Sequence, residues 1–100
     1  MSSSQTEARR PRAVRVRMTD EAVCVELADG RCVSVPVGWY PRLLHGTPVE
    51  RGNFRIMGQG EGIHWTDLDE DLSVDGLLAG RASTESQASL ERWLRGRAKP

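Results

Sequence analysis

Near the start of the chain, apolar side chains occupy every second position in residues 14–18, 23–27 and 33–37. This period of two is typical of strands that bury one face and expose the other. Thr19-Asp20-Glu21 separates the first two segments, and Asp29-Gly30, a frequent hairpin sequence, separates the last two. The pattern therefore predicts a three-stranded antiparallel meander.

The register of the Asp29-Gly30 hairpin follows if both apolar rows lie on one face. A two-residue loop would turn the two rows to opposite faces, and a strand with one buried face does not tolerate such a slip. We therefore expect a three-residue loop, residues 29–31, with its glycine in the left-handed conformation. This loop pairs Leu27 with Val33 and Val25 with Val35.

The two cysteines lie on these neighbouring strands. In the expected register Cys24 faces Pro36, and Cys32 is four residues away along the strand. A rise of about 3.3 Å per residue separates the two by about 13 Å, which is beyond the reach of a disulfide. We expect two reduced thiols and a cytoplasmic protein. The sequence has neither a signal peptide nor an apolar run of the ~18–20 residues that a membrane helix needs.

Capping residues divide much of the remaining chain into short helices. Trp39 to Gly46 has helical apolar spacing, and Thr47-Pro48-Val49-Glu50 is a capping box that begins a second helix. Ser73 to Gly80 predicts a third, with the serine as N-cap and the glycine as stop. A capping box of Thr84 and Gln87 predicts a C-terminal helix that ends at Arg97.

Residues 54–57 and 62–65 are two further strand-like segments. They flank the turn Gly58-Gln59-Gly60-Glu61 and predict a second hairpin. The expected fold class is α+β: a small three-stranded antiparallel meander plus a second hairpin, with short helices and a C-terminal helix. A chain of 100 residues has room for one small domain, whose core is only just sufficient at this size.

Charge divides the chain into three parts, although the net charge is zero. Residues 1–18 carry five arginines and one glutamate, residues 19–80 four arginines and eleven acids, and residues 81–100 five bases and two acids. The predicted organisation is a disordered basic tail (1–12), a small α+β domain (13–82) and a C-terminal amphipathic helix (83–100). An acidic domain with basic ends suits a basic protein partner or, through its ends, nucleic acid.

Several sequence blocks between Asp29 and Gly80 occur together in one known family. They are Asp-Gly-Arg from residue 29, Trp-Tyr-Pro-Arg-Leu-Leu from residue 39, Gly-Glu-Gly-Ile-His-Trp from residue 60, and the acidic run with the helix that follows it. In this order they resemble the bacterial domain of unknown function numbered 2442, over residues 13–80. The resemblance implies a small α+β fold without an assigned activity or catalytic residues. Some relatives carry an added helix-turn-helix, but this chain has room for only one short helix after Gly80. Other relatives look like candidate toxin–antitoxin partners.

Oxygen-bearing side chains occupy alternate positions, as they do in the first part of a calcium loop, namely Asp67, Asp69, Asp71, Ser73 and Asp75. That loop also needs glycine at its sixth position and glutamate at its twelfth, where this chain has Leu72 and Leu78. Helix capping and an Asx turn explain such acids without a metal. We therefore expect no metal and no cofactor, and a weak cation site is the less favoured alternative.

His64 should point to the face of its strand opposite to Ile63 and Trp65. It could act as a general base with Asp67 or Asp69 nearby. A lone histidine in a strand is more often structural, however, and neither a nucleophile elbow nor a zinc spacing accompanies it. We predict that the protein is not an enzyme, and a hydrolytic or metal site around His64 is the weaker hypothesis.

The leading functional prediction is a non-enzymatic protein-binding module, an antitoxin-like partner of a small basic protein. Trp93 supports it, because this tryptophan has few apolar companions on its helix and tryptophan is enriched at interfaces; packing into the core is the equal alternative for this residue. The predicted partner-binding residues are the apolar stripe of the last helix and the acids after Trp65, namely Leu90, Trp93, Leu94, Asp67, Asp69, Glu70 and Asp71. The expected partner is another protein or, in a homo-oligomer, a second copy of this chain.

The alternative prediction is a nucleic-acid-associated regulatory protein that uses its basic terminal arms. Arg9, Arg10 and Arg12 would then contact phosphate groups. No aromatic residues interleave with these arginines, and the acidic domain behind them would weaken the attraction. Nucleic acid is therefore the less favoured partner, and a membrane is not expected to be one.

Overall fold

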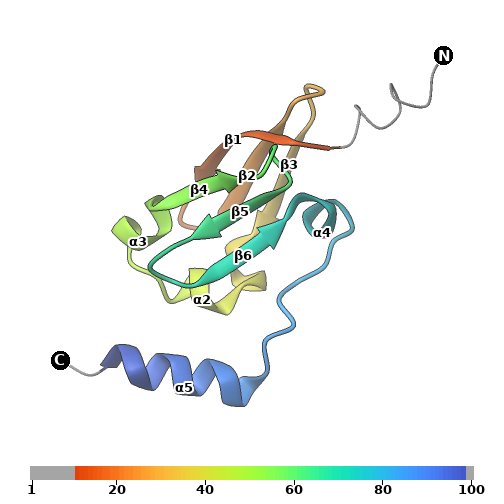
Figure 1. The fold of residues 1–100 in the computed structure, drawn as a ribbon. Helices are drawn as coiled ribbons and strands as arrows, with labels where there is room; N and C mark the ends of the chain where they lie inside the picture. The colour runs from red at the N-terminus through yellow and green to blue at the C-terminus, as the bar shows by residue number, and fades with distance from the viewer. Residues whose placement is uncertain (1–10, 99–100) are drawn as a thin grey trace.

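The computed structural model describes residues 11–98, and its first three strands form the predicted meander. β1 (Ala13–Met18), β2 (Ala22–Leu27) and β3 (Cys32–Pro36) pair antiparallel in the order β1-β2-β3. Figure 1 shows this sheet behind a second one. In β2, every second residue is buried, as the apolar pattern predicted. Residues 1–10 of the predicted basic tail lie outside the described residues.

The predicted register of the β2–β3 hairpin is wrong by two residues. Val25 pairs with Val33, whereas the predicted partner was Val35. The Leu27 N–H donates to the Arg31 carbonyl at 2.8 Å, so the three-residue loop consists of residues 28–30. A shift by two keeps every side chain on its face, and the apolar pattern therefore cannot distinguish these two registers.

The loop glycine and the thiols agree with the prediction. Gly30 has a φ angle of 93°, in the left-handed region that favours glycine. Cys24 and Cys32 are both free. Because of the register shift, Cys24 faces Ser34 instead of Pro36, so the two cysteines are two residues apart along the strands and not four.

A second antiparallel sheet contains the predicted second hairpin and one more strand. β4 (Phe54–Met57) and β5 (Gly62–Trp65) confirm the hairpin, and β6 (Glu70–Ser73) adds to β5, in the order β4-β5-β6. The α+β class is confirmed. β6 was not predicted, because acids fill half of it and only one residue, Leu72, is a large apolar one.

The presence of β6 changes the structural role of Asp67 and Asp69, which were expected to precede a helix. Residues 66–69 form the turn between β5 and β6, and Leu68 in this turn is fully buried. Asp69 has a φ angle of 49°, which aspartate tolerates better than most residues. Asp67 accepts a hydrogen bond from Asn53 Nδ2 at 2.8 Å. These two acids therefore belong to a hairpin turn, and the prediction that they cap a helix is wrong.

The helix predicted for residues 39–46 is shorter and divided. A 3-10 turn, η1 (Val37–Trp39), is followed by α2 (Pro41–Leu44), in which the proline occupies the first helical position. α3 (Pro48–Gly52) has the predicted capping box, with hydrogen bonds of 2.9 and 3.1 Å between Thr47 and Glu50.

Two helices follow the second sheet. In α4 (Val74–Leu78) the Ser73 hydroxyl accepts from the Gly76 N–H at 2.9 Å, which confirms the predicted N-cap. α5 (Gln87–Ala98) begins three residues later than predicted. The Ser86 hydroxyl accepts from the Ser89 N–H at 3.1 Å, so the predicted capping box at Thr84 is wrong. Residues 79–86 are a linker between α4 and α5.

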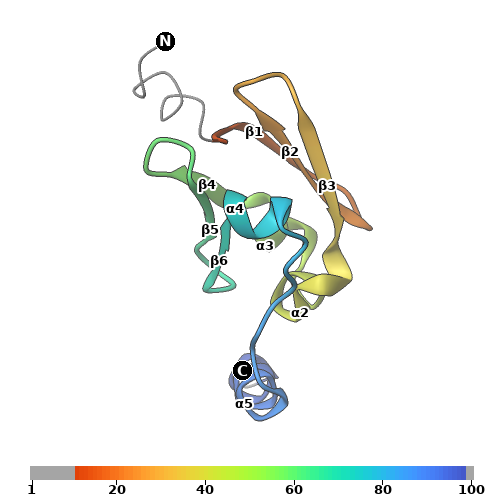
Figure 2. The same cartoon turned by 90° about the vertical axis from the view of Figure 1, so that its right-hand side faces the viewer.

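One core joins the two sheets. The buried side chains of the two sheets are Ala13, Val23, Val25, Leu27, Val35, Ile63, Trp65 and Leu72. Trp65 is fully buried, and its indole N–H donates to the Arg51 carbonyl at 2.9 Å. Trp39 packs at the margin of the core and is partly buried. Figure 2 shows the two sheets on either side of this core, with α5 standing apart from both.

Candidate functional site

An open groove with a volume of about 590 Å³ lies alongside β6. β6 pairs with β5 on one side only, so its other edge is free. Across the groove lie the linker and the start of α5. The lining residues are Tyr40, Arg42, residues 69–73, Gly76, Leu77, residues 81–85 and Ser89. We call this site the β6 groove.

Hydrogen bonds hold the linker wall of the β6 groove in place. The Tyr40 hydroxyl donates to the Arg81 carbonyl at 3.1 Å, and the Ser83 N–H donates to the Trp39 carbonyl at 3.0 Å. The Arg81 N–H also donates to the Gly76 carbonyl of α4 at 2.9 Å. The linker wall is therefore tied to both the η1–α2 segment and α4.

Arg42 forms the floor of the groove and is saturated by partners from this chain. Its guanidinium donates to both Glu85 carboxylate oxygens, the shortest contact being 2.6 Å, and to the carbonyls of Leu68 and Asp69. Glu85 also accepts from the Ser89 hydroxyl at 2.8 Å. The hydrogen bonds between Arg42 and Glu85 lower the pKa of the glutamate and raise that of the arginine. Most of the hydrogen-bonding capacity of Arg42 is therefore used within its own chain.

Glu70 differs from Glu85 because it is not paired with a base. It is half-buried in the groove, and its Oε1 accepts a hydrogen bond from the Asp71 N–H at 3.1 Å. Within residues 11–98, no arginine or histidine forms an ion pair with it. Burial raises the pKa of Glu70, although the Asp71 N–H and the nearby charge of Arg42 lower it in part, and burial together with the Glu70 charge raises the pKa of Tyr40. A cation that enters the groove would relieve this unfavourable position of the carboxylate.

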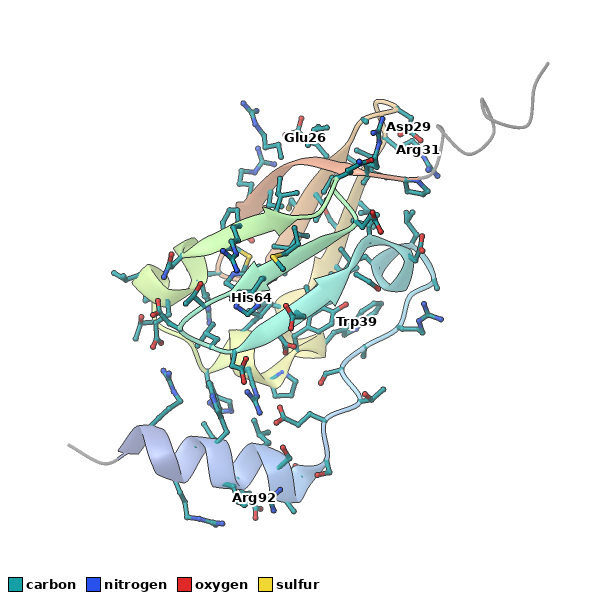
Figure 3. All side chains as sticks on the ribbon, viewed as in Figure 1. Glu26, Asp29, Arg31, Trp39, His64 and Arg92 are labelled. Atoms are coloured by element: carbon teal, nitrogen blue, oxygen red, sulfur yellow. The ribbon has the colours of Figure 1, made fainter. Side chains whose placement is uncertain are left out.

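His64 lies outside the groove, on the outer face of the second sheet (Figure 3). Its Nδ1 is 2.7 Å from the Asp71 Oδ1, and the two residues pair directly across β5 and β6. The sequence had suggested Asp67 or Asp69 as the partner of His64. In the structure the partner is Asp71. This arrangement is a cross-strand pair on an open face, of the kind that stabilises sheets.

α5 is attached to the domain by its aromatic residue and by charges. The Arg42 guanidinium lies 5.0 Å from the centre of the Trp93 ring, and the Arg97 guanidinium lies 4.7 Å from it. Arg97 also pairs with Glu50 of α3 at 2.6 Å. Trp93 packs against the core and Leu90 is buried, so both predicted partner-binding residues contact their own domain.

The structure thus separates the predicted binding residues into two groups. Asp69, Glu70 and Asp71 line the β6 groove, and Leu90, Trp93 and the half-buried Leu94 lie on α5. Asp67 is in the turn and outside the groove lining. Sequence reasoning missed Tyr40, Arg42 and Glu85. No local pattern could reveal the pair of Arg42 with Glu85, because 43 residues separate the two.

Only some of the basic residues of the alternative prediction lie within the described residues. Arg9 and Arg10 lie outside the described residues, whereas Arg12 is exposed beside the start of β1. Arg15 and Arg17 of β1 are exposed too, and Arg15 lies 3.5 Å from Glu26.

Two other kinds of site are absent from the described part of the chain. Between residues 11 and 98, no three histidine, cysteine, aspartate or glutamate side chains come together so that they could hold a metal ion. No helix of the same part combines the length and the apolar character needed to cross a membrane.

Comparison with known proteins places these features in context. Residues 13–83 match a family described as protein of unknown function, DUF2442. A crystal structure of a protein of unknown function from Rhodospirillum rubrum is 34% identical, with a TM-score of 0.69 over 78% of this chain and 96% of that one. A solution NMR structure of an uncharacterised protein from Chromobacterium violaceum, 20% identical, has a similar fold, with a TM-score of 0.66 over 95% of this chain and 84% of that one. No curated protein matches the sequence.

Proposed function

This chain belongs to the DUF2442 family of proteins of unknown function, and we propose that it is a non-enzymatic protein-binding module whose partner is a small basic protein. The observation that supports this proposal is the β6 groove, in which Glu70 is half-buried and has no basic partner among residues 11–98. A lysine or arginine of the partner supplies the missing positive charge.

The character of the groove favours a polypeptide over a small molecule. Small-molecule pockets are enclosed and mostly apolar, with few polar groups. The β6 groove is open, and most of its lining side chains are polar or charged. Because Glu85 holds Arg42 and Asp71 pairs with His64 on the outer face, Glu70 is the acid of this edge that is left to attract a positive charge.

An antitoxin-like role is the specific form of this proposal that the family resemblance suggests. In that role the domain covers the basic surface of a small partner protein and thereby blocks its action. The proposed location is the cytoplasm, in keeping with the free thiols of Cys24 and Cys32.

The proposal is tested by binding measurements with charge variants of the groove. The tagged chain is purified from its native host, and the proteins that co-purify with it are identified. The affinity of each purified candidate for the chain is then measured by calorimetry. We expect a small basic protein whose binding weakens about tenfold or more in the double variant Glu70→Gln, Asp71→Asn.

The matched control is Asp20→Asn, Glu21→Gln, which removes the same charge at the exposed turn between β1 and β2. The control should bind almost as tightly as the unmodified protein. Equal weakening by both double variants would show that net charge, and not the groove, attracts the partner, and the proposal would fail.

A second candidate function is nucleic-acid-associated regulation, which the exposed Arg12, Arg15 and Arg17 favour. Its test is binding to duplex DNA over a range of salt concentrations. Affinity that falls steeply with salt and is lost when Arg9, Arg10 and Arg12 are changed to alanine would support this function. Binding that is unaffected by these changes would exclude it.

A further inference from the structure

The hydrogen-bond pattern of the second sheet decides which backbone groups face the β6 groove. The Val74 N–H donates to the Glu61 carbonyl at 2.9 Å, in register with the pairs between β5 and β6. In an antiparallel ladder, hydrogen-bonded and non-hydrogen-bonded pairs alternate. Alternate residues of β6, Asp71 and Ser73, therefore turn their backbone N–H and C=O groups away from β5 and toward the groove.

One of these outward groups already has a partner, and that partner is a side chain. The Asp71 N–H donates to the Glu70 carboxylate. Outside the ladder with β5, no hydrogen bond among residues 11–98 uses the Asp71 carbonyl or the Ser73 N–H. A free strand edge with such groups readily accepts another strand, and charged side chains commonly protect it. Glu70 is such a protecting residue, because it covers one backbone donor of the edge.

We propose that the partner binds the β6 groove as an added β-strand that carries a lysine or arginine. The inference rests on the proposed function and specifies how that partner is held. Its backbone bonds to the outward groups of Asp71 and Ser73, and in doing so displaces the Glu70 carboxylate from the Asp71 N–H. The displaced carboxylate then pairs with the basic side chain of the incoming strand.

The exchange makes strand addition selective for a basic segment. When a carbonyl of the incoming strand takes over the Asp71 N–H, Glu70 loses its hydrogen bond while it is still half-buried. A lysine or arginine replaces that bond with an ion pair. A neutral or acidic strand leaves the carboxylate unpaired, which is costly for a buried charge. Glu70 thus protects the edge from unsuitable strands and accepts a suitable one.

The same charges argue against a second copy of this chain as the occupant. Antiparallel pairing of two β6 edges would bring Glu70 and Asp71 of one copy close to the same acids of the other. Like charges opposite each other across a strand pair are destabilising. The basic segment of a different protein therefore fits this edge better than a copy of β6 does.

The test uses short synthetic peptides and amide NMR spectra of the full chain. The probes are an alternating lysine–valine peptide, the matching glutamate–valine peptide, and two lysine–valine peptides that are N-methylated along one edge or along the other. We expect the lysine–valine peptide to shift the amide signals of Asp71 and Ser73 most. N-methylation along the pairing edge should weaken its binding about tenfold, and N-methylation along the other edge should have little effect.

Variants of the protein give an independent measurement. Glu70→Gln keeps an acceptor for the Asp71 N–H but removes the charge, and should weaken binding of the lysine–valine peptide about tenfold. Asp71→Pro removes the carboxylate and one backbone donor that β5 does not use, and proline is tolerated on an edge strand. It should bind the peptide less tightly than its control Asp71→Ala, which lacks the same carboxylate but retains the N–H. Thermal unfolding of each variant verifies that it is folded.

The possible outcomes separate this inference from the proposed function. If the lysine–valine peptide binds at the groove regardless of N-methylation, and Asp71→Pro equals Asp71→Ala, strand addition is wrong and binding of a basic partner stands. If the glutamate–valine peptide binds as tightly as the lysine–valine peptide, the role of Glu70 is wrong. If neither peptide binds at millimolar concentration, or if β6 edges pair in a dimer, both the inference and the proposed groove function fail.

Discussion

Replacing Arg97 by alanine is expected to release α5 from the domain. The Arg97 guanidinium donates to both Glu50 carboxylate oxygens, at 2.6 and 2.9 Å, and lies over the ring of Trp93. The substitution removes these contacts and leaves the capping box of α3 intact, because that box consists of Thr47 and Glu50. The effect should therefore be confined to the attachment of α5.

The magnitude follows from the pKa of Glu50. The hydrogen bonds from Arg97, and then the backbone hydrogen bond from Thr47, lower this pKa from 4.5 to about 2. The whole shift corresponds to roughly 3 kcal/mol at about 1.4 kcal/mol per pKa unit. The Glu50 side chain is 21% exposed, and screening by solvent together with the share of Thr47 leaves about 1–2 kcal/mol for Arg97. The lost contact with Trp93 adds about 0.5–1 kcal/mol.

This loss is large for a helix of 12 residues, which is marginal when it stands alone. Amide hydrogen exchange followed by NMR measures it directly. In Arg97→Ala, protection of the α5 amides should fall by about tenfold or more, while protection of the two sheets stays unchanged. The matched control is Arg95→Ala, which removes an exposed arginine of the same helical turn. Equal loss of protection in both variants would refute the reasoning.

Three further predictions concern pH, the groove floor and a glycine turn. Because the pKa of Glu50 is lower in the folded state, its contribution is complete above about pH 4.5 and is lost as the pH falls toward 2, so an acid titration by NMR should release α5 in that range. Arg42→Lys keeps the charge but loses the two-pronged contact with Glu85, and should lower the unfolding free energy by about 1–2 kcal/mol in urea; an unchanged midpoint would contradict this. Gly60→Ala should destabilise by more than about 2 kcal/mol, since φ is 93° and the added Cβ would lie 2.7 Å from a backbone oxygen of β1. Gly30→Ala has the same φ and open space around it, so urea unfolding should show a loss of only about 1 kcal/mol; equal losses in the two glycine variants would contradict the steric argument.

Local patterns in the sequence were sufficient where one face of an element is buried. The alternation in β2 and the glycine-rich turn between β4 and β5 identified strands and hairpins, because a side-chain period of two is a property of the strand itself. The caps at Thr47 and Ser73 were found for a similar reason, since each involves residues at most three positions apart. The acids of the candidate site were recognised as a group, but with an incorrect local structure.

β6 was missed because it is an edge strand with charged residues. Its sequence Glu-Asp-Leu-Ser has one large apolar side chain, and such a segment is hard to distinguish from a loop by periodicity. The charges that hide this strand from pattern analysis are the same charges that protect its free edge. Where edge protection and strand propensity conflict, only the pairing with β5 identifies the strand.

The sequence by itself determined the α+β class, the β1–β2, β2–β3 and β4–β5 hairpins, the caps of α3 and α4 and the acidic character of the middle of the chain, because these depend on neighbours along the chain. Only the tertiary structure decided the β2–β3 register, the existence of β6 and the β6 groove. A register shift by two leaves the apolar pattern unchanged, and the groove depends on contacts such as Arg42 with Glu85, whose residues become neighbours only when the chain has folded.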